Sequence, residues 1–302
     1  MAISVQVQAP AKLNLALAVG PPDERGMHPI RSWMVTVSLA DDLEVTRLQD
    51  TRKSHYAVLW HAEARRRREI DWPVSRDLSV RAHLALQQHV GRTLPVRMKL
   101  LKRIPAGGGL GGGSSDAAAM LHAVNALFEL GLADDVLRGI AAGLGCDVPF
   151  FIGGGSALVH GFGEQVEPLD RLTELHAVVV LPDSVCPTGQ VYGAFDELDR
   201  VTASRAGDVE VLARSGAALR SDSVFNDLAA AAIRVAPGLG THLQQLGDLA
   251  QRPAHVAGSG SSLFVLCDDP LHAEQLAEAA ERRLGLPALA VRGPQRLLWV
   301  RS

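Results

Sequence analysis

Apolar and polar residues alternate at the start of the chain, and this pattern predicts β-strand. The alternation covers residues 3–7, is interrupted at Pro10, and resumes over residues 13–19. Successive side chains of a strand point to opposite faces of its sheet. Lys12 and Asn14 are therefore predicted to share one face of the second strand, while the leucines occupy the other.

Spacing and turn residues predict elements along the rest of the chain. An apolar-rich strand over residues 33–39 is followed by DLEVTRL at 42–48, which we expect to be its antiparallel neighbour. Asp77 is the expected cap of a helix that runs to about residue 90. Strands are predicted over 96–100, near 157, over 176–181, over 263–267 and twice at the end; helices are predicted over 134–142, 191–198, 208–213, 226–235 and 271–284.

The stretch KRIPAGGGLGGGSSDAAAMLHAVN, residues 102–125, has six glycines among the seven residues 107–113. Glycine loses much backbone entropy on folding, so a cluster indicates positive φ angles or a partner close to the backbone. A helix with an apolar inner face follows, and Ser114 or Ser115 is its expected N-cap. A helix N-terminus has unpaired N–H groups and partial positive charge, so the loop is predicted to hold an anion, with phosphate as the first hypothesis.

Two phosphate-binding fingerprints can be tested on this loop. Gly107, Gly109 and Gly112 satisfy GxGxxG, but a dinucleotide site needs its glycines directly after a strand and an acidic residue after the next strand. Here Pro105 intervenes and another helix follows. No lysine follows the glycines as in a Walker motif. A triphosphate in this loop would therefore need a cation from elsewhere in the chain.

Lys12 and Asp147 are the candidates for that cation and for a base. Phosphoryl transfer needs an aligned acceptor hydroxyl, neutralisation of the developing charge, and a carboxylate that accepts the proton. An isolated lysine or aspartate is more often a surface or cap residue. The hypothesis therefore depends on both side chains meeting the glycine loop.

Composition limits the partners. A chain of 302 residues, 47% of them hydrophobic, is typical of a soluble globular protein with two domains or one large one. The formal net charge of -3 gives no general attraction to nucleic acid or to an anionic membrane. Arg65, Arg66, Arg67 and Arg68 form one short basic run, for which we expect a solvated loop or helix face rather than an RNA-binding patch.

The cysteines and the first residues bear on location. Cys146, Cys186 and Cys267 form no CxxC pair, which predicts neither a disulfide framework nor a zinc site and fits a reducing cytoplasm. The first twenty residues lack a basic segment followed by an unbroken apolar core, and no stretch approaches the length of a bilayer span. We therefore expect a cytoplasmic protein without a membrane or nucleic-acid partner, as a monomer or homodimer.

Four motifs in their order resemble one family. APAKLNLALAV, PAGGGLGGGSSDAAA, GCDVPFF and GSGSSLF are similar to motifs of the GHMP kinases, the superfamily of galactokinase, homoserine kinase and mevalonate kinase. The resemblance runs from about residue 10 to residue 264. It implies an α+β fold with the active site in the cleft between two domains, 1–155 and 156–302, the last strands being free to return to the first. It also implies ATP and Mg²⁺.

Within the superfamily, the motifs most resemble kinases that phosphorylate the 2-hydroxyl of a cytidylated methylerythritol in the non-mevalonate route to isoprenoids. Another GHMP kinase of the homoserine or mevalonate type is an alternative. A non-catalytic nucleotide-binding protein on the same fold is a second one. A Rossmann oxidoreductase is a more distant third, because it rests on the partial GxGxxG match alone.

The resemblance implies roles for individual residues. Asp147 would be the catalytic base, and Lys12 would orient the acceptor hydroxyl and stabilise the transferring charge. The ATP phosphates would lie against the loop, and Ser114 or Ser115 would lie near Mg²⁺. The loop consists of Pro105, Ala106, Gly107, Gly108, Gly109, Leu110, Gly111, Gly112, Gly113, Ser114 and Ser115. The acceptor would contact Asn14, Met27, His28, Thr188, Tyr192, Gly258, Ser259 and Gly260.

The chain departs from the family pattern at Met27. The family usually has DGYH where this chain has RGMH at 25–28, so Met27 replaces a tyrosine expected to stack on cytosine. Stacking of a base on an aromatic ring contributes about 1–3 kcal/mol, and a methionine sulfur contact about 0.3–1.5 kcal/mol. We therefore expect weakened but retained cytidine recognition, with Tyr192 as the remaining ring. Residues 53–72 also fit the family poorly.

Overall fold

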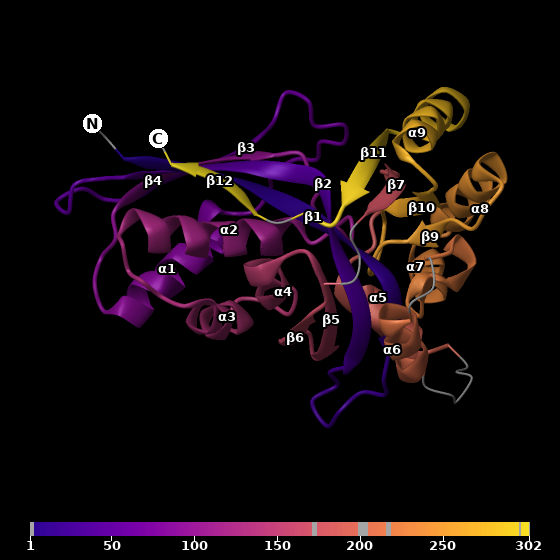
Figure 1. Ribbon diagram of the computed structural model, residues 1–302, viewed down its shortest axis with the longest axis horizontal. Coiled ribbons are helices and arrows are strands. Elements are labelled where there is room, and N and C mark those ends of the chain that lie inside the picture. Colours follow the sequence, from indigo (N-terminus) through magenta and orange to yellow (C-terminus); the bar gives the residue numbers. More distant parts are fainter. Residues whose placement is uncertain (1–2, 171–173, 199–204, 216–218, 296, 302) are drawn as a thin grey trace.

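The computed structural model describes residues 3–170, 174–198, 205–215, 219–295 and 297–301. Within these residues the strands form a sheet of eight and a sheet of four. The larger sheet and its helices make up one end of the molecule, and the smaller sheet and its helices make up the other (Figure 1).

Two long strands, β1 (Ser4–Val19) and β2 (Ile30–Arg47), form the centre of the larger sheet. They pair antiparallel, with a register shift between Pro10 and Ala11. The proline is thus accommodated by an irregularity within one strand, and the predicted interruption was wrong. The prediction that 33–39 and 42–48 are antiparallel neighbours was also wrong. Both belong to β2, whose two halves pair with different strands on the side away from β1.

Shorter strands complete the larger sheet. β4 (Val96–Lys102) pairs with the second half of β2, and β3 (His55–Trp60) lies parallel to β4. β5 (Ser156–Gly161) pairs with the first half of β2, β6 (Gln165–Pro168) with β5, and β8 (Phe225–Asn226) and β12 (Leu298–Arg301) with β1. β5 and β6, which follow residue 155, thus belong to the larger sheet, and the end of the chain lies beside its beginning (Figure 1).

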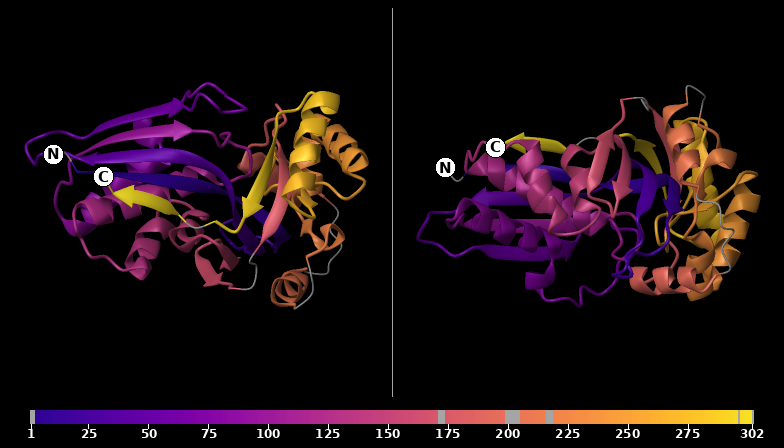
Figure 2. Two further views of the ribbon diagram at one scale, coloured as in Figure 1. Left: turned by 45° about the horizontal axis from the view of Figure 1, so that its top comes forward. Right: turned by 90° about the horizontal axis from the view of Figure 1, so that it is seen from below.

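Helices α1 (Leu78–Val90), α2 (Gly112–Leu127), α3 (Asp134–Ala142) and α4 (Val148–Gly153) cover one face of the larger sheet (Figures 1 and 2). Asp77 caps α1 by accepting from the backbone N–H of Ser79, as predicted. The predicted serine cap of α2 was wrong, because the helix already begins at Gly112 and its N-cap is Gly111. Ser114 and Ser115 therefore lie in its first turn.

The smaller sheet is antiparallel and runs β11 (Ala288–Gly293), β7 (Leu175–Val180), β10 (Leu263–Cys267), β9 (His255–Val256). Helices α5 (Thr188–Asp196), α7 (Ala229–Val235), α8 (Gly238–Ala250) and α9 (Pro270–Leu284) lie at this end, whereas α6 (Ala206–Arg214) contacts β1 and β2 of the larger sheet. The apolar runs LHAVVV and LFVLC form the buried strands β7 and β10, as their composition predicts. Short 3₁₀ turns lie at Val74–Arg76 and Ser221–Ser223.

None of the helices in the described parts of the chain is both long and apolar enough to cross a bilayer.

Candidate active site

A cavity of about 900 Å³ gathers residues from both ends of the molecule. Its walls come from the second half of β1, the glycine loop, the segment before α4, and the start of α5. Of the predicted site residues, it is lined by Lys12, Asn14, Met27, His28, all of residues 105–114, Asp147, Thr188, Tyr192, Gly258 and Ser259. Ser115 and Gly260 do not line it: Ser115 is buried in α2, and a side chain at Gly260 would meet Cys186 and Val256.

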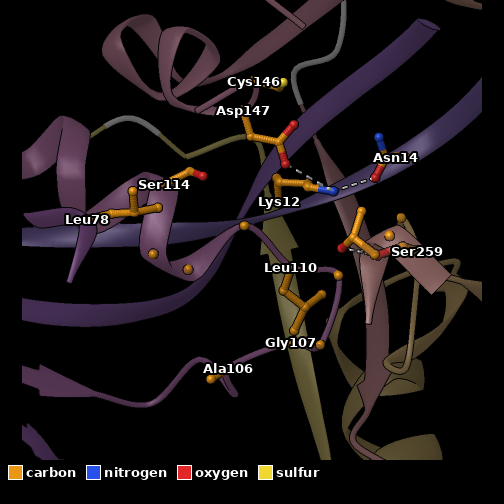
Figure 3. Close-up of a pocket in the computed structure, with 18 of the residues that line it drawn as sticks. Lys12, Asn14, Leu78, Ala106, Gly107, Leu110, Ser114, Cys146, Asp147 and Ser259 are labelled. Atoms are coloured by element: carbon orange, nitrogen blue, oxygen red, sulfur yellow. Dashed lines mark hydrogen bonds and ion pairs between the residues drawn. The ribbon is translucent and has the colours of Figure 1, made fainter. Parts of the chain in front are cut away.

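Lys12 and Asp147 face each other across this cavity (Figure 3). The Lys12 ammonium lies 3.8 Å from a carboxylate oxygen of Asp147, and the two side chains are 4% and 30% exposed. Asp147 precedes α4 at the N-cap position, but its side chain makes no capping hydrogen bond. The carboxylate is instead available to the cavity, beside a buried cation.

Asn14 fixes the position of the Lys12 ammonium. Lys12 Nζ donates to Asn14 Oδ1 at 2.7 Å, so both side chains share one face of β1 as predicted. Asn14 Nδ2 in turn donates to Ser32 Oγ on β2 at 2.8 Å, and Ser32 Oγ donates to the Ala16 carbonyl at 2.8 Å. Burial lowers the pKa of Lys12, while the charge of Asp147 opposes that shift.

The glycine loop is held between two other backbone segments. Lys12 N–H donates to the Leu110 carbonyl at 2.9 Å, and Ser262 N–H donates to the Gly108 carbonyl at 3.1 Å. At Gly109, where φ is +75°, a Cβ would lie 2.0 Å from the Ala257 carbonyl oxygen. The loop is therefore rich in glycine partly because the protein's own backbone approaches it this closely.

The start of α2 faces the cavity with its glycines and Ser114 (Figure 3). The first N–H groups of a helix have no partner within the helix, and the aligned peptide dipoles place partial positive charge there. Ser115 Oγ in the same turn is buried and has no hydrogen-bond partner among the described residues. Those residues also contain no group of three or more His, Cys, Asp or Glu side chains placed to hold a metal ion.

A buried cluster of three charged side chains lies where the glycine loop begins and ends, and the sequence interpretation missed it. Lys102, the last residue of β4, pairs with Asp41 on β2 at 2.5 Å and with Asp116 in α2. Asp41 also accepts from the backbone N–H groups of Arg103 and Ile104. The cluster thus ties both ends of the loop to β2. Lys102 in KRIP was the available sequence signal.

The charges of this cluster are uneven. Two carboxylates face one ammonium, and Asp116 Oδ1 is buried without a hydrogen-bond partner among the described residues. Burial, together with the charges of Asp41 and Asp77, raises the pKa of Asp116 against the opposing effect of Lys102. Burial lowers the pKa of Lys102, but the two carboxylates outweigh it and raise that pKa overall. The raised pKa of Asp116 favours its protonated form, which would lessen the excess of negative charge in the cluster.

Aromatic and polar side chains gather at the far end of the cavity. His28 Nδ1 donates to the Gly20 carbonyl at 2.8 Å, and its Nε2 lies 3.3 Å from Asp196. The His28 and Tyr192 rings lie 5.3 Å apart, and burial raises the pKa of Tyr192 to about 12. Met27 is 44% exposed and lines the cavity beside them. Phe162, which the sequence did not indicate, lines it too.

Two residues predicted for the acceptor contact each other at the smaller end of the molecule. Thr188 at the start of α5 lies 3.1 Å, oxygen to oxygen, from Ser259 in the second glycine-serine loop. A side chain at Gly258 in that loop would lie 3.0 Å from Lys12 Nζ. The second loop therefore closes against both the glycine loop and the ammonium.

Comparison with known proteins decides the family. A family model described as "GHMP kinases N terminal domain" matches residues 77–155. The 4-diphosphocytidyl-2-C-methyl-D-erythritol kinase of Pseudarthrobacter chlorophenolicus is 34% identical over 312 aligned positions, covering 96% of this chain and 93% of that protein. The kinase of the same name from Salinispora arenicola is 37% identical and covers 96% and 92%. The chain belongs to the family of 4-diphosphocytidyl-2-C-methyl-D-erythritol kinases.

Solved structures agree with this family. The crystal structure of a 4-(cytidine 5'-diphospho)-2C-methyl-D-erythritol kinase matches with a TM-score of 0.74 at 33% identity, covering 96% of this chain and all of the other. Homoserine kinase from Cytophaga hutchinsonii has the same TM-score at 18% identity, covering 98% and 97%, which shows the fold alone. The α+β GHMP kinase fold predicted from the motifs is confirmed.

The first prediction contrasts two glycines of the loop. Gly109→Ala combines a positive φ with a collision against the Ala257 carbonyl, whereas Gly107→Ala, at φ +69°, has nothing within 4 Å of its new Cβ. The left-handed conformation alone costs about 1–2 kcal/mol. We expect the free energy of unfolding to fall by about that much for Gly107→Ala and by clearly more for Gly109→Ala, measured by urea denaturation. Equal losses would contradict the backbone contact.

The second prediction concerns the buried charges. Lys102→Met leaves Asp41 and Asp116 without their cation, and we expect a loss of about 3–5 kcal/mol in the free energy of unfolding. Asp116→Asn keeps the shape and removes one anion, so we expect it to be tolerated at pH 8. The measurement is urea denaturation of both variants.

Urea denaturation at several pH values measures how the free energy of unfolding changes with the charge of Asp116. With its raised pKa, Asp116 holds a proton in the folded state that the unfolded chain has already released above about pH 3.9. The stability of the wild type therefore falls as pH rises from there through the raised pKa. Asp116→Asn should remove this part of the pH dependence. An Asn variant as unstable at pH 8 as Lys102→Met would contradict the raised pKa of Asp116.

Proposed function

We propose that this protein transfers the γ-phosphate of ATP to the 2-hydroxyl of 4-diphosphocytidyl-2-C-methyl-D-erythritol, in the non-mevalonate route to isoprenoid precursors. The observation that carries the proposal is the buried Lys12 ammonium, 3.8 Å from the Asp147 carboxylate, in one cavity with the start of α2. Family membership supports the choice of acceptor.

Each part of this site has a chemical task in phosphoryl transfer. Asp147 accepts the proton of the attacking hydroxyl, and Lys12, held by Asn14, orients that oxygen and offsets the charge that develops on the transferring group. The glycine loop and the first N–H groups of α2 bind the phosphate oxygens. These donors are fixed before the substrate arrives, because the loop is tied to β1 and to the Ala257 segment.

Mg²⁺ fits this arrangement through the nucleotide rather than through a protein cage. Mg²⁺ is commonly held by substrate phosphates, waters and one or two protein oxygens. Ser114 lines the cavity in the first turn of α2 and would supply such an oxygen, whereas Ser115 is buried within the helix and does not line the cavity. When bound, the ion neutralises charge on the β- and γ-phosphates.

The far end of the cavity suits a cytidine. It offers the Tyr192 ring, the His28 imidazole and the Met27 thioether as apolar faces, with Asp196 as a polar group at the wall. Asp77 and Leu78, at the opposite end, line the part that would take the adenine of ATP. The two nucleotides thereby meet at Lys12 and Asp147, which lie between these ends.

The third prediction tests the catalytic pair. Asp147→Asn removes the proton acceptor and Lys12→Met removes the buried cation, and we expect either change to lower kcat by roughly 10²–10⁴-fold, the size of general acid–base and electrostatic contributions. The assay measures ADP release with the cytidylated acceptor, with homoserine and with mevalonate. Asp135→Asn is the matched control, because that carboxylate is 94% exposed on α3. Near-normal turnover of either site variant would reject its role, and equal turnover of all acceptors would reject the substrate.

The fourth prediction concerns Met27. Met27→Tyr restores a ring at the position where the family usually has one, and a stacked ring contributes about 1–3 kcal/mol against about 0.3–1.5 kcal/mol for a sulfur contact. We expect the KM for the cytidylated acceptor to fall by roughly tenfold, a free-energy difference of about 1.4 kcal/mol, while the KM for ATP stays the same. An unchanged acceptor KM would show that Met27 does not face the base.

A further inference from the structure

The arginine run, expected to be a solvated loop or helix face, is only half solvated. It lies in residues 61–77, the connection between β3 and α1. Arg65 and Arg67 are exposed, whereas Arg66 and Arg68 are half-buried. Alternate arginines of the run are therefore turned toward the rest of the protein.

The two inward arginines contact the other end of the molecule. Arg66 donates from Nε and Nη2 to the Leu181 carbonyl at 3.1 and 2.9 Å, and its Nη1 lies 3.5 Å from Asp183. Arg68 Nη2 donates to the Ser184 carbonyl at 2.7 Å. Both carbonyls belong to residues 181–187, the connection that leads from β7 to α5. A guanidinium suits this task because its N–H groups lie in one rigid plane.

The run is itself fixed to the larger sheet. Trp60, the last residue of β3, donates from its indole nitrogen to the Arg68 carbonyl at 2.6 Å. Arg68 is thus held at its backbone by one end of the molecule and at its side chain by the other. Arg65 adds an exposed ion pair with Glu281 on α9 at 3.1 Å, a type of contact that contributes little.

The two connections joined in this way end at opposite parts of the candidate active site. Residues 61–77 continue into Trp72, Arg76 and Asp77, which line the cavity at the proposed adenine end. Residues 181–187 continue into Thr188 and Tyr192, which line it at the proposed cytidine end. A shift of either connection would move one nucleotide site relative to the other.

We propose that Arg66 and Arg68 are positioning residues that hold the acceptor-side connection, residues 181–187, against the nucleotide-side connection, residues 61–77. They touch neither reacting group. By fixing Thr188 and Tyr192 relative to Lys12 and Asp147, they orient the acceptor for transfer. This role rests on the proposed function, since the acceptor is the molecule whose position they set.

The fifth prediction compares variants within the run. Arg66→Ala combined with Arg68→Ala removes the contacts between the two connections. Arg67→Ala is the matched control, because Arg67 is exposed and its guanidinium donates to Ala62 within its own loop. We expect the acceptor KM of the double variant to rise by roughly tenfold, equivalent to about 1.4 kcal/mol. The KM for ATP and every constant of Arg67→Ala should stay within about twofold, a change below about 0.5 kcal/mol.

Two further measurements separate positioning from general stability. Amide hydrogen exchange should become faster in peptides covering 182–190 in the double variant, and not in strands β1 and β2, because local opening exposes the amides of one segment. Arg66→Lys keeps the charge but cannot present two N–H groups in one plane. It should therefore behave like Arg66→Ala if the geometry matters.

The acceptor KM and the exchange pattern together decide whether Arg66 and Arg68 position the acceptor. An acceptor KM and an exchange pattern equal to those of Arg67→Ala would overturn the proposal. A uniform loss of protection, with both KM values unchanged, would also overturn it, since the arginines would then only stabilise the fold. If the wild type and Arg67→Ala fail to phosphorylate the cytidylated acceptor, the proposed function fails instead, and faster exchange confined to 182–190 would still support the contact between the two connections.

Discussion

The candidate active site depends on how closely three chain segments pack around Lys12. Its backbone N–H holds the glycine loop through Leu110, and its ammonium lies between Asn14 and Asp147. A Cβ at Gly111 would come within 3.1 Å of the lysine side chain, and one at Gly258 within 3.0 Å of its nitrogen. Such contacts leave no room for a side chain from either neighbouring loop. The ammonium is thus held by the Asn14 side chain and confined by the backbone of the two loops.

Burying the charged Lys12 side chain costs desolvation free energy. Burial favours the neutral amine, and the Asp147 charge works against that effect. The second buried lysine, Lys102, is also desolvated, but two carboxylates stabilise its charged form and raise its pKa above the ordinary value. The two lysines therefore differ in kind. Lys102 is paired with two buried carboxylates and supports the loop, whereas Lys12 has a single, partly exposed carboxylate beside it and lines the cavity.

Capping residues and the spacing of apolar residues correctly predicted elements that depend on neighbouring residues alone. Asp77 capped α1 as expected, and α3 has the predicted bounds. The serine cap of α2 failed because Gly111, in the left-handed conformation, starts the helix earlier. The sequence pattern predicted two separate strands within β2. The structure shows one continuous strand, whose first half pairs with β5 and whose second half pairs with β4. Strand β3 lies at the edge of the sheet beside β4, where its sequence carries only a weak pattern.

In the site, too, the sequence motifs indicated individual residues but not the contacts between residues far apart in the chain. Motif resemblance named Lys12, Asp147 and the glycine loop, and the fold brings them to one cavity. Asp41 is separated from Lys102 by 61 positions and Arg66 from Leu181 by 115, so no local pattern links them. In a run of four arginines the sequence also cannot show which side chains are buried, because all four residues are the same. Which of them turns inward is decided by carbonyls more than a hundred residues later.

The glycines of the loop have more than one structural cause. A cluster of glycines was interpreted as space for a phosphate. At Gly109 and Gly111 that space is filled by the Ala257 carbonyl, by Phe151 and by the Lys12 side chain. Gly107 has no atom within 4 Å of a would-be Cβ, and Gly113 has only a Leu78 methyl group at 3.5 Å. Gly109 therefore serves the contact between the two ends of the molecule, and Gly111 leaves room for Phe151 and Lys12 at its own end. The outer glycines leave the backbone open on the side of the cavity.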